Sequence, residues 1–195
     1  FPYTTLFRST WLAFGDVPIM GWVFDKVSVL LAPAFVIIGL LVSIYATAYL
    51  TPENREHPDE PRRRFFAFMV MFIGAMPGVV YSSTIIGQLV FFEITGACSW
   101  ALIGYYGTDV ARSSAMKALI VTHIASLGLY LATVCLFLQT GTFELSAIAA
   151  LPEGWKTFVL LAILFAAWGK SAQLPFYMWL PSAMNAPRSE EHTSE

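Results

Sequence analysis

The sequence predicts an all-α membrane protein with about five transmembrane helices, the last of them broken near Pro175. Of the 195 residues, 57% are hydrophobic and only 12% are charged, whereas charged residues make up about a quarter of a soluble domain. Long apolar runs, of the roughly 20 residues needed to cross a hydrocarbon core, alternate with short polar segments. The last run ends between Pro175 and Pro181, and proline removes a backbone hydrogen bond from a helix.

The apolar runs give the five expected helices. They are Val27–Leu50, Phe65–Ser83, Thr84–Tyr106, Ser113–Leu138 and Thr157–Trp179. Pro33 falls in the first turns of its run, where a proline is best tolerated. Pro77 lies between Gly74 and Gly78, a spacing that predicts close helix approach together with a kink. The second and third runs nearly touch, so a very short turn is expected around Ser82–Thr84.

Polar segments connect these runs. Thr10–Lys26 contains Trp11 and Trp22 and is expected to be an external loop or a short segment at headgroup level. Thr51–Arg64 holds the densest cluster of charge, eight of the 24 charged residues, together with three prolines, which predicts a solvated loop. Gln139–Lys156 is expected to be a polar loop that can hold a short helix at Glu144–Leu151.

The loop charges predict the orientation in the membrane. Segments 51–64 and 107–112 fall on the same side and carry five arginines, against only Lys26 and Lys156 on the other side. The positive-inside rule places the arginine-rich side in the cytoplasm. The expected location is therefore the cytoplasmic (inner) membrane of a bacterium, in a multi-pass topology. A net charge of −2 without a basic surface argues against nucleic acid as a partner.

Both ends of the chain are expected to lie outside the fold. Residues 1–9 (FPYTTLFRS) and 188–195 (RSEEHTSE) match in-frame translations of two paired short-read sequencing adapters. We interpret both as adapter-derived tails and residues 10–187 as a fragment of a membrane domain.

Four ionisable side chains fall within the apolar runs: Glu93, Lys117, His123 and Lys170. A charge at the centre of a membrane helix costs roughly 2.5–3.5 kcal/mol on insertion scales, and such residues usually mark an ion path. Each of the four can bind and release a proton, and a changing Glu–Lys pair could gate a proton on the lysine. No metal-ligand spacing, nucleophile–base pair or phosphate loop accompanies them. Cys98 and Cys135 lie in separate apolar runs, and no cofactor is expected.

Structural alternatives exist for each of these residues. Glu93 could be a neutral acid hydrogen-bonded between helices, and Lys170 could extend its side chain to the membrane boundary. Lys117 lies only about a turn inside its run, so the same alternative is stronger there. His123, which shares a helix face with Ser126, could bond a neighbouring helix for purely structural reasons.

The sequence resembles the antiporter-like membrane subunits of complex I, Mrp antiporters and membrane-bound hydrogenases. The likeness lies in FFEITGACSWALIGYY, AMKALIVTHIASLGLYL and WGKSAQLPFYMWLPSAMNAP, and it is strongest to the hydrogenase-4 component D branch. The resemblance implies that this is a fragment of an antiporter-like fold of about fourteen helices. It also implies that Glu93 and Lys170 form the proton-gating pair and that Lys117 matches a common lysine. Three positions depart from the family pattern, since His123, Ser126 and Asn185 replace a frequent arginine, aspartate and glutamate.

Three functions follow as hypotheses. The first is a proton-translocating subunit of a redox-driven complex of the hydrogenase-4 or NADH:quinone oxidoreductase type. Such a subunit has no redox centre of its own and assembles with membrane and peripheral subunits in the lipid bilayer. The alternatives are a static membrane scaffold and an Mrp-type Na⁺/H⁺ antiporter subunit.

Overall fold

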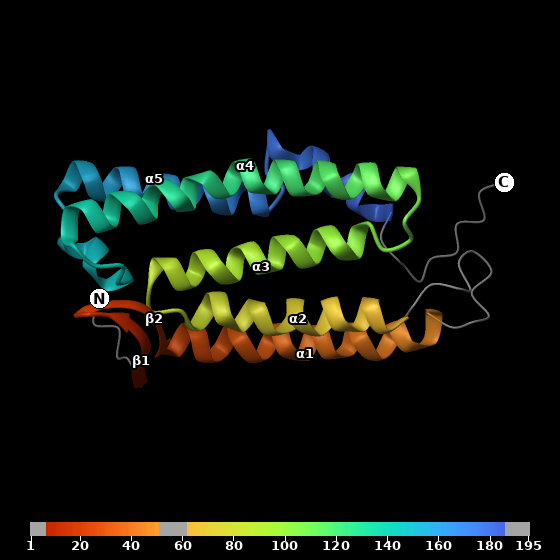
Figure 1. Cartoon of the computed structure of the whole chain (residues 1–195), viewed down its shortest axis with the longest axis horizontal. Coiled ribbons are helices and arrows are strands. Elements are labelled where there is room, and N and C mark those ends of the chain that lie inside the picture. Colours follow the sequence, from red (N-terminus) through yellow and green to blue (C-terminus); the bar gives the residue numbers. More distant parts are fainter. Residues whose placement is uncertain (1–6, 51–61, 186–195) are drawn as a thin grey trace.

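Five long helices lie side by side along one axis in the computed structural model, which describes residues 7–50 and 62–185 (Figure 1). They are α1 (Lys26–Tyr49), α2 (Arg62–Tyr81), α3 (Ile85–Ile103), α4 (Asp109–Thr140) and α5 (Glu153–Lys170). Helices α1 and α2 form one side of the molecule, α4 and α5 form the other, and α3 lies between the two pairs. The predicted antiporter-like helical membrane fold is confirmed, although the boundaries of the runs shift.

Four of the described helices, α1 to α4, are long and apolar enough to cross a membrane. Helix α5 is the fifth predicted span, and its 18 residues include Glu153, Lys156 and Lys170. The arginine-rich start of α2 and the turn from α3 to α4 lie at the same end of the bundle, as the orientation argument requires. Most of the predicted loop Thr51–Arg64 and the whole tail 188–195 lie outside the described residues.

The helix starts are fixed by polar side chains next to apolar runs. In α1, Asp25 Oδ1 accepts the Ser28 backbone N–H at 2.7 Å, and Ser28 Oγ accepts the Asp25 N–H at 2.9 Å. In α3, Thr84 Oγ1 accepts the Gly87 N–H at 3.1 Å. These contacts satisfy backbone donors that the first turn of a helix leaves free. The short turn predicted around Ser82–Thr84 is confirmed.

The N-terminal segment is a β-hairpin, so the prediction of an irregular loop over Thr10–Lys26 is wrong, and an interfacial position stays a prediction. Strand β1 (Phe7–Phe14) pairs antiparallel with β2 (Val17–Phe24). Phe14 pairs with Val17, which leaves Gly15 and Asp16 as a two-residue turn with Gly15 at φ +59°. A glycine at positive φ between two runs of apolar residues is a hairpin signal.

Residues assigned to the N-terminal tail take part in this hairpin. Phe7–Ser9 are the first residues of β1, and Arg8 Nη2 forms an ion pair with Glu144 Oε1 at 2.6 Å. Glu144 belongs to the segment between α4 and α5, so the ion pair joins the hairpin to the opposite side of the bundle. That segment also contains the short helix allowed for by the sequence, as the 3₁₀ helix η1 (Leu145–Ala150).

Hydrogen bonds connect the hairpin to the helix layer. Thr84 Oγ1 donates to the Ile19 carbonyl at 2.6 Å, and the Ser83 N–H donates to the Gly21 carbonyl at 3.0 Å. A side chain at Gly21 would clash with both partners, because an added Cβ would lie 2.6 Å from the Ser9 carbonyl oxygen and 2.7 Å from the Ser83 Oγ of the α2–α3 turn. This close approach ties the β1–β2 hairpin to the α2–α3 turn.

The main core lies between α4 and α5. Leu129, Leu136 and Val159 are buried there, and Ile85 at the start of α3 packs against the same cluster. Glycines allow the two backbones to come close: a Cβ on Gly169 would overlap the Cβ of Ala125. This contact fixes the end of α5 beside the middle of α4, two positions from His123.

The predicted break in the last helix is confirmed, and it begins about one turn before Pro175. Helix α5 ends at Lys170, and three short helices follow: η2 (Phe176–Met178), α6 (Trp179–Ser182) and η3 (Ala183–Asn185). A proline clashes with the carbonyl four residues before it, which for Pro175 belongs to Ser171. The helix therefore ends at the residue before that carbonyl.

Polar groups in the broken segment find partners within the fold. The Gln173 N–H donates to the Trp168 carbonyl at 3.2 Å, and the indole Nε1 of Trp179 donates to the Gly169 carbonyl at 3.2 Å. Non-helical backbone within a membrane requires such partners.

Candidate functional site

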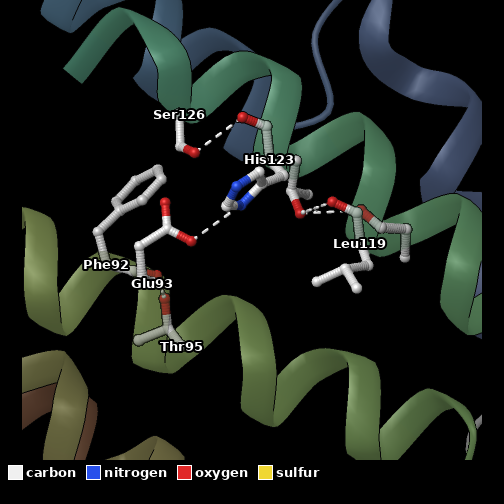
Figure 2. A network of polar contacts seen from close by, with 8 residues as sticks. Phe92, Glu93, Thr95, Leu119, His123 and Ser126 are labelled. Atoms are coloured by element: carbon white, nitrogen blue, oxygen red, sulfur yellow. Dashed lines mark hydrogen bonds and ion pairs between the residues drawn. The ribbon is translucent and has the colours of Figure 1, made fainter. Parts of the chain in front are cut away.

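Glu93 lies near the midpoint of α3 and is the only charged residue of that helix. Its side chain is 29% exposed and points from α3 toward α4 (Figure 2). The sequence around it is otherwise apolar or small. A carboxylate held there needs hydrogen-bond donors from neighbouring helices, because apolar surroundings disfavour its charged form.

His123 of α4 is the direct partner of Glu93. Its Nδ1 lies 3.1 Å from Glu93 Oε2 (Figure 2). A carboxylate accepts hydrogen bonds and cannot donate, so Nδ1 carries the proton when Glu93 is ionised. The His123 side chain is 54% exposed, so it is less enclosed than the carboxylate that it contacts.

The second carboxylate oxygen of Glu93 has no hydrogen-bond donor beside it in the described part of the chain. This atom, Oε1, is buried. An unsatisfied buried polar atom typically costs about 1–3 kcal/mol, more when it is charged. The contact between Glu93 and His123 thus satisfies only one of the two oxygens, and a second donor would be bound favourably.

Lys170 is the last residue of α5 and lies against the same helix as Glu93. Its Nζ is 4.7 Å from the centre of the Phe92 ring. It is also close to Gly96, where an added Cβ would lie 3.5 Å from Nζ. A cation over an aromatic face is stabilised by the ring, more strongly where water is excluded.

The expected Glu93–Lys170 ion pair is not formed in the described part of the chain, where Glu93 instead pairs with His123. Phe92 and Glu93 are neighbours in the sequence, and they face α5 and α4 respectively. Lys170 therefore lies on the adjacent face of α3 rather than across the bundle.

A small cavity adjoins Lys170 between α3, α4 and α6. Its volume is about 10 Å³, and Ser99, Thr122 and Trp179 are among its lining residues. This is close to the minimum space for one water molecule, and the two hydroxyls and the ammonium supply polar partners for it.

Lys117 is not part of this cluster. It is exposed, and its Nζ lies 3.3 Å from Ser182 Oγ in α6. Ser126, expected to share a face with His123, donates its hydroxyl to the His123 carbonyl at 2.8 Å and not to the imidazole ring. The structure thus brings together Glu93, His123 and Lys170 and places Lys117 apart.

Sequence reasoning missed three contributors to the site: Phe92, Gly96 and Trp179. Phe92 and Gly96 are four positions apart and therefore share the face of α3 that meets Lys170. That spacing was a usable signal once a lysine was expected nearby. Nothing in the sequence indicated that Trp179 would bond the Gly169 carbonyl.

Comparison with known proteins places the chain in a family. The family described as "NADH:quinone oxidoreductase/Mrp antiporter, TM" matches residues 82–190, more than half of the 195 residues. The chain belongs to this family. All four candidate residues lie within the matched range, and the chain is a multi-pass membrane protein of the NADH:quinone oxidoreductase/Mrp antiporter type.

Curated relatives include both an antiporter subunit and a quinone oxidoreductase subunit. The chain is 38% identical over 156 residues to a probable K(+)/H(+) antiporter subunit of Rhizobium meliloti, covering 77% of this chain and 15% of that protein. It is 33% identical over 189 residues to "NAD(P)H-quinone oxidoreductase chain 5" of Picosynechococcus sp., covering 91% of this chain and 28% of that protein. The chain therefore spans less than a third of the length of either relative.

Solved structures agree with this assignment. A chain of the Mrp complex from Dietzia sp. superposes with a TM-score of 0.79 at 27% identity, covering 96% of this chain and 20% of that one. A chain of the archaeal membrane-bound sulfane sulfur reductase superposes with a TM-score of 0.70 at 21% identity, covering 92% of this chain and 37% of that one. The second likeness supports the fold alone.

Proposed function

We propose that this chain is part of a proton-translocating membrane subunit of a redox-driven complex, of the hydrogenase-4 or NADH:quinone oxidoreductase type. The observation that carries the proposal is the convergence of Glu93, His123 and Lys170 beside the break that ends α5. Three proton-exchanging side chains on three helices provide successive positions for a proton within an otherwise apolar layer.

Glu93 acts in this proposal as a switch between two cations. In one state, Glu93 Oε2 accepts the His123 Nδ1 proton, and Lys170 rests on the Phe92 ring. In the other state, the Lys170 ammonium turns toward Glu93 and occupies the unpartnered Oε1. Breaking either contact leaves a partly desolvated charge, which promotes proton release from the cation that has lost its partner.

The broken helix makes such a movement feasible. Lys170 ends α5, so its backbone is followed by turns and not by another helical turn. The cavity lined by Ser99 and Thr122 adjoins the Nζ and offers a position for a water molecule that exchanges the proton. Electron transfer would take place in other subunits and drive the switch from a distance.

The whole protein is proposed to work in an assembly. Two of the compared structures are named as a complex, the Mrp complex and an archaeal respiratory membrane complex. By analogy, this chain would assemble with other membrane and peripheral subunits in a bacterial cytoplasmic membrane. The loop charges support the arginine-rich end as the cytoplasmic one.

The second candidate is a subunit of an antiporter. It is favoured by the name of the Rhizobium relative and by the likeness to the Mrp complex. The same three residues would then exchange a proton against Na⁺ or K⁺. Pumping that depends on Na⁺ or K⁺, and not on electron transfer, would favour this candidate over the redox-driven one.

Replacing Glu93 in the full-length protein, within its complex, tests the proposal. Glu93→Gln should abolish proton pumping in inverted vesicles while electron transfer to artificial acceptors continues, because the amide cannot exchange the proton. Glu153→Gln is the matched control, since Glu153 is 88% exposed at the start of α5. Pumping at the wild-type rate in Glu93→Gln would contradict the proposal, and a defect in assembly alone would favour the static scaffold.

A further inference from the structure

A basic cavity lies at the other end of α3, away from the hairpin. Its volume is about 350 Å³, and it is lined by residues from the start of α2, the end of α3 and the start of α4. Arg64 and Arg112 both line it, together with Trp100, Gly104 and Met116. Neither the proton site nor the family match assigns a role to this cavity.

The charge of the cavity is not balanced by the described residues. Neither Arg64 nor Arg112 forms an ion pair within the described ranges, and no acidic side chain lines the cavity. Asp109, in the first turn of α4, is the nearest acid to Arg112 along that helix and is not part of the lining. Arg112 itself lies close to the N-terminus of α4, where the peptide dipoles also favour an anion.

The position and walls of the cavity match a phospholipid. Helix α3 ends at Ile103, so the cavity lies at the level where the apolar layer gives way to headgroups. Trp100 and Met116 line it and are 40% and 46% exposed, which offers apolar surface beside the two guanidinium groups. A charged head beside an apolar wall is the chemistry of an anionic lipid.

We propose that this cavity binds the phosphate of an anionic phospholipid, with its acyl chain along Trp100 and Met116. Arginine matches phosphate geometrically, because the planar guanidinium donates two parallel hydrogen bonds. Gly104 also lines the cavity, and because an added Cβ there would lie 3.2 Å from the Ala115 Cβ, the glycine lets α3 and α4 pack closely beside it. The bound lipid would join the start of α2 to the start of α4 at the cytoplasmic surface, a junction that no ion pair of the described residues makes.

Titration with dioleoyl phosphatidylglycerol, followed by native mass spectrometry of the full-length protein in detergent, measures the first lipid bound. Arg64→Gln and Arg112→Gln should each raise its dissociation constant about fivefold, the contribution of one arginine near a membrane surface. Arg63→Gln is the control, because Arg63 is exposed beside Arg64 but does not line the cavity. Circular dichroism of each variant establishes that the helices are intact.

Three outcomes would overturn the proposal. The first is unchanged phosphatidylglycerol affinity in the variant that lacks both arginines. The second is an equal loss of affinity in Arg63→Gln, which would indicate a generally basic surface. The third is displacement of the lipid by millimolar inorganic phosphate, or equal binding of phosphatidylcholine, since then phosphate without an acyl chain, or a lipid without net negative charge, would bind as well.

Discussion

The molecule has two apolar regions, one formed by α1 and α2 and the other by α3, α4 and α5. They differ in whether a proline interrupts a helix and in whether charged side chains lie inside the helices. Pro33 and Pro77 lie inside α1 and α2, and both helices continue through them. Helix α5 stops before Pro175. Beyond the arginines that begin α2, the interiors of α1 and α2 contain no charged residue, whereas α3, α4 and α5 supply Glu93, His123 and Lys170.

This difference shows what permits a helix break in a membrane. A proline alone is insufficient, because the freed backbone groups need partners that lipid cannot provide. At the end of α5 the partners are present: Trp179 donates to the Gly169 carbonyl, and Gln173 donates to the Trp168 carbonyl. The break is therefore retained where polar groups gather, and the same place holds the ionisable site.

The largest expected effect is on proton transport, which should depend on His123 of α4 in the full-length protein and not on Lys26 of α1. His123→Gln keeps a hydrogen-bond donor near Glu93 but loses the exchangeable proton. We expect proton transport in vesicles to fall by at least roughly 100-fold, as when a general acid–base group is removed. Lys26→Gln, at the start of α1, is the control and should retain wild-type transport. Unchanged transport in His123→Gln would show that the Glu93–His123 contact has a structural role and no role in proton transfer.

Replacing one glycine in each region with alanine tests how tightly the helices of that region pack. In α5, a Cβ on Gly169 would overlap the Ala125 Cβ, which has no rotamer to escape into. In α1, a Cβ on Gly39 would meet the side chain of Ile73, which can rotate away. Gly169→Ala should therefore lower the free energy of unfolding by about 1–3 kcal/mol, and Gly39→Ala by less. Thermal unfolding of both variants in detergent measures this, and an equal loss would mean that α1 and α2 pack as rigidly as α4 and α5.

The sequence alone predicted the long helices, because an apolar run of membrane-spanning length has few stable conformations other than a helix. It did not predict the strands of Phe7–Phe24, because a two-residue turn at Gly15–Asp16 is a short signal and the two tryptophans also fit an irregular segment. At α5 the proline predicted the break, and because its clash acts on the preceding turn, the helix ends at Lys170.

The site was predictable in its members and not in its contacts. Glu93, His123 and Lys170 stood out because charge is rare in apolar helices. Which two of them touch depends on how each helix is rotated about its axis, and this is set by close packing such as Gly169 on Ala125. That packing placed Lys170 on Phe92 and left His123 as the partner of Glu93. Sequence spacing carries no information about that rotation.

The smallest expected effect concerns the start of α1, a helix that exposes most of its surface and depends on its own ends for stability. The Ser28 backbone N–H holds the pKa of Asp25 below its ordinary value of 3.8. Because the folded-state pKa is the lower one, the stabilisation is complete above the ordinary value and is lost as the pH falls through the folded-state pKa.

Asp25→Ala should lower the free energy of unfolding by about 1 kcal/mol at neutral pH and by less in strong acid. Thermal unfolding between neutral and acidic pH tests this, with the exposed turn residue Asp16→Ala as control. A loss in Asp25→Ala that stays constant with pH would show that the cap acts through shape rather than charge.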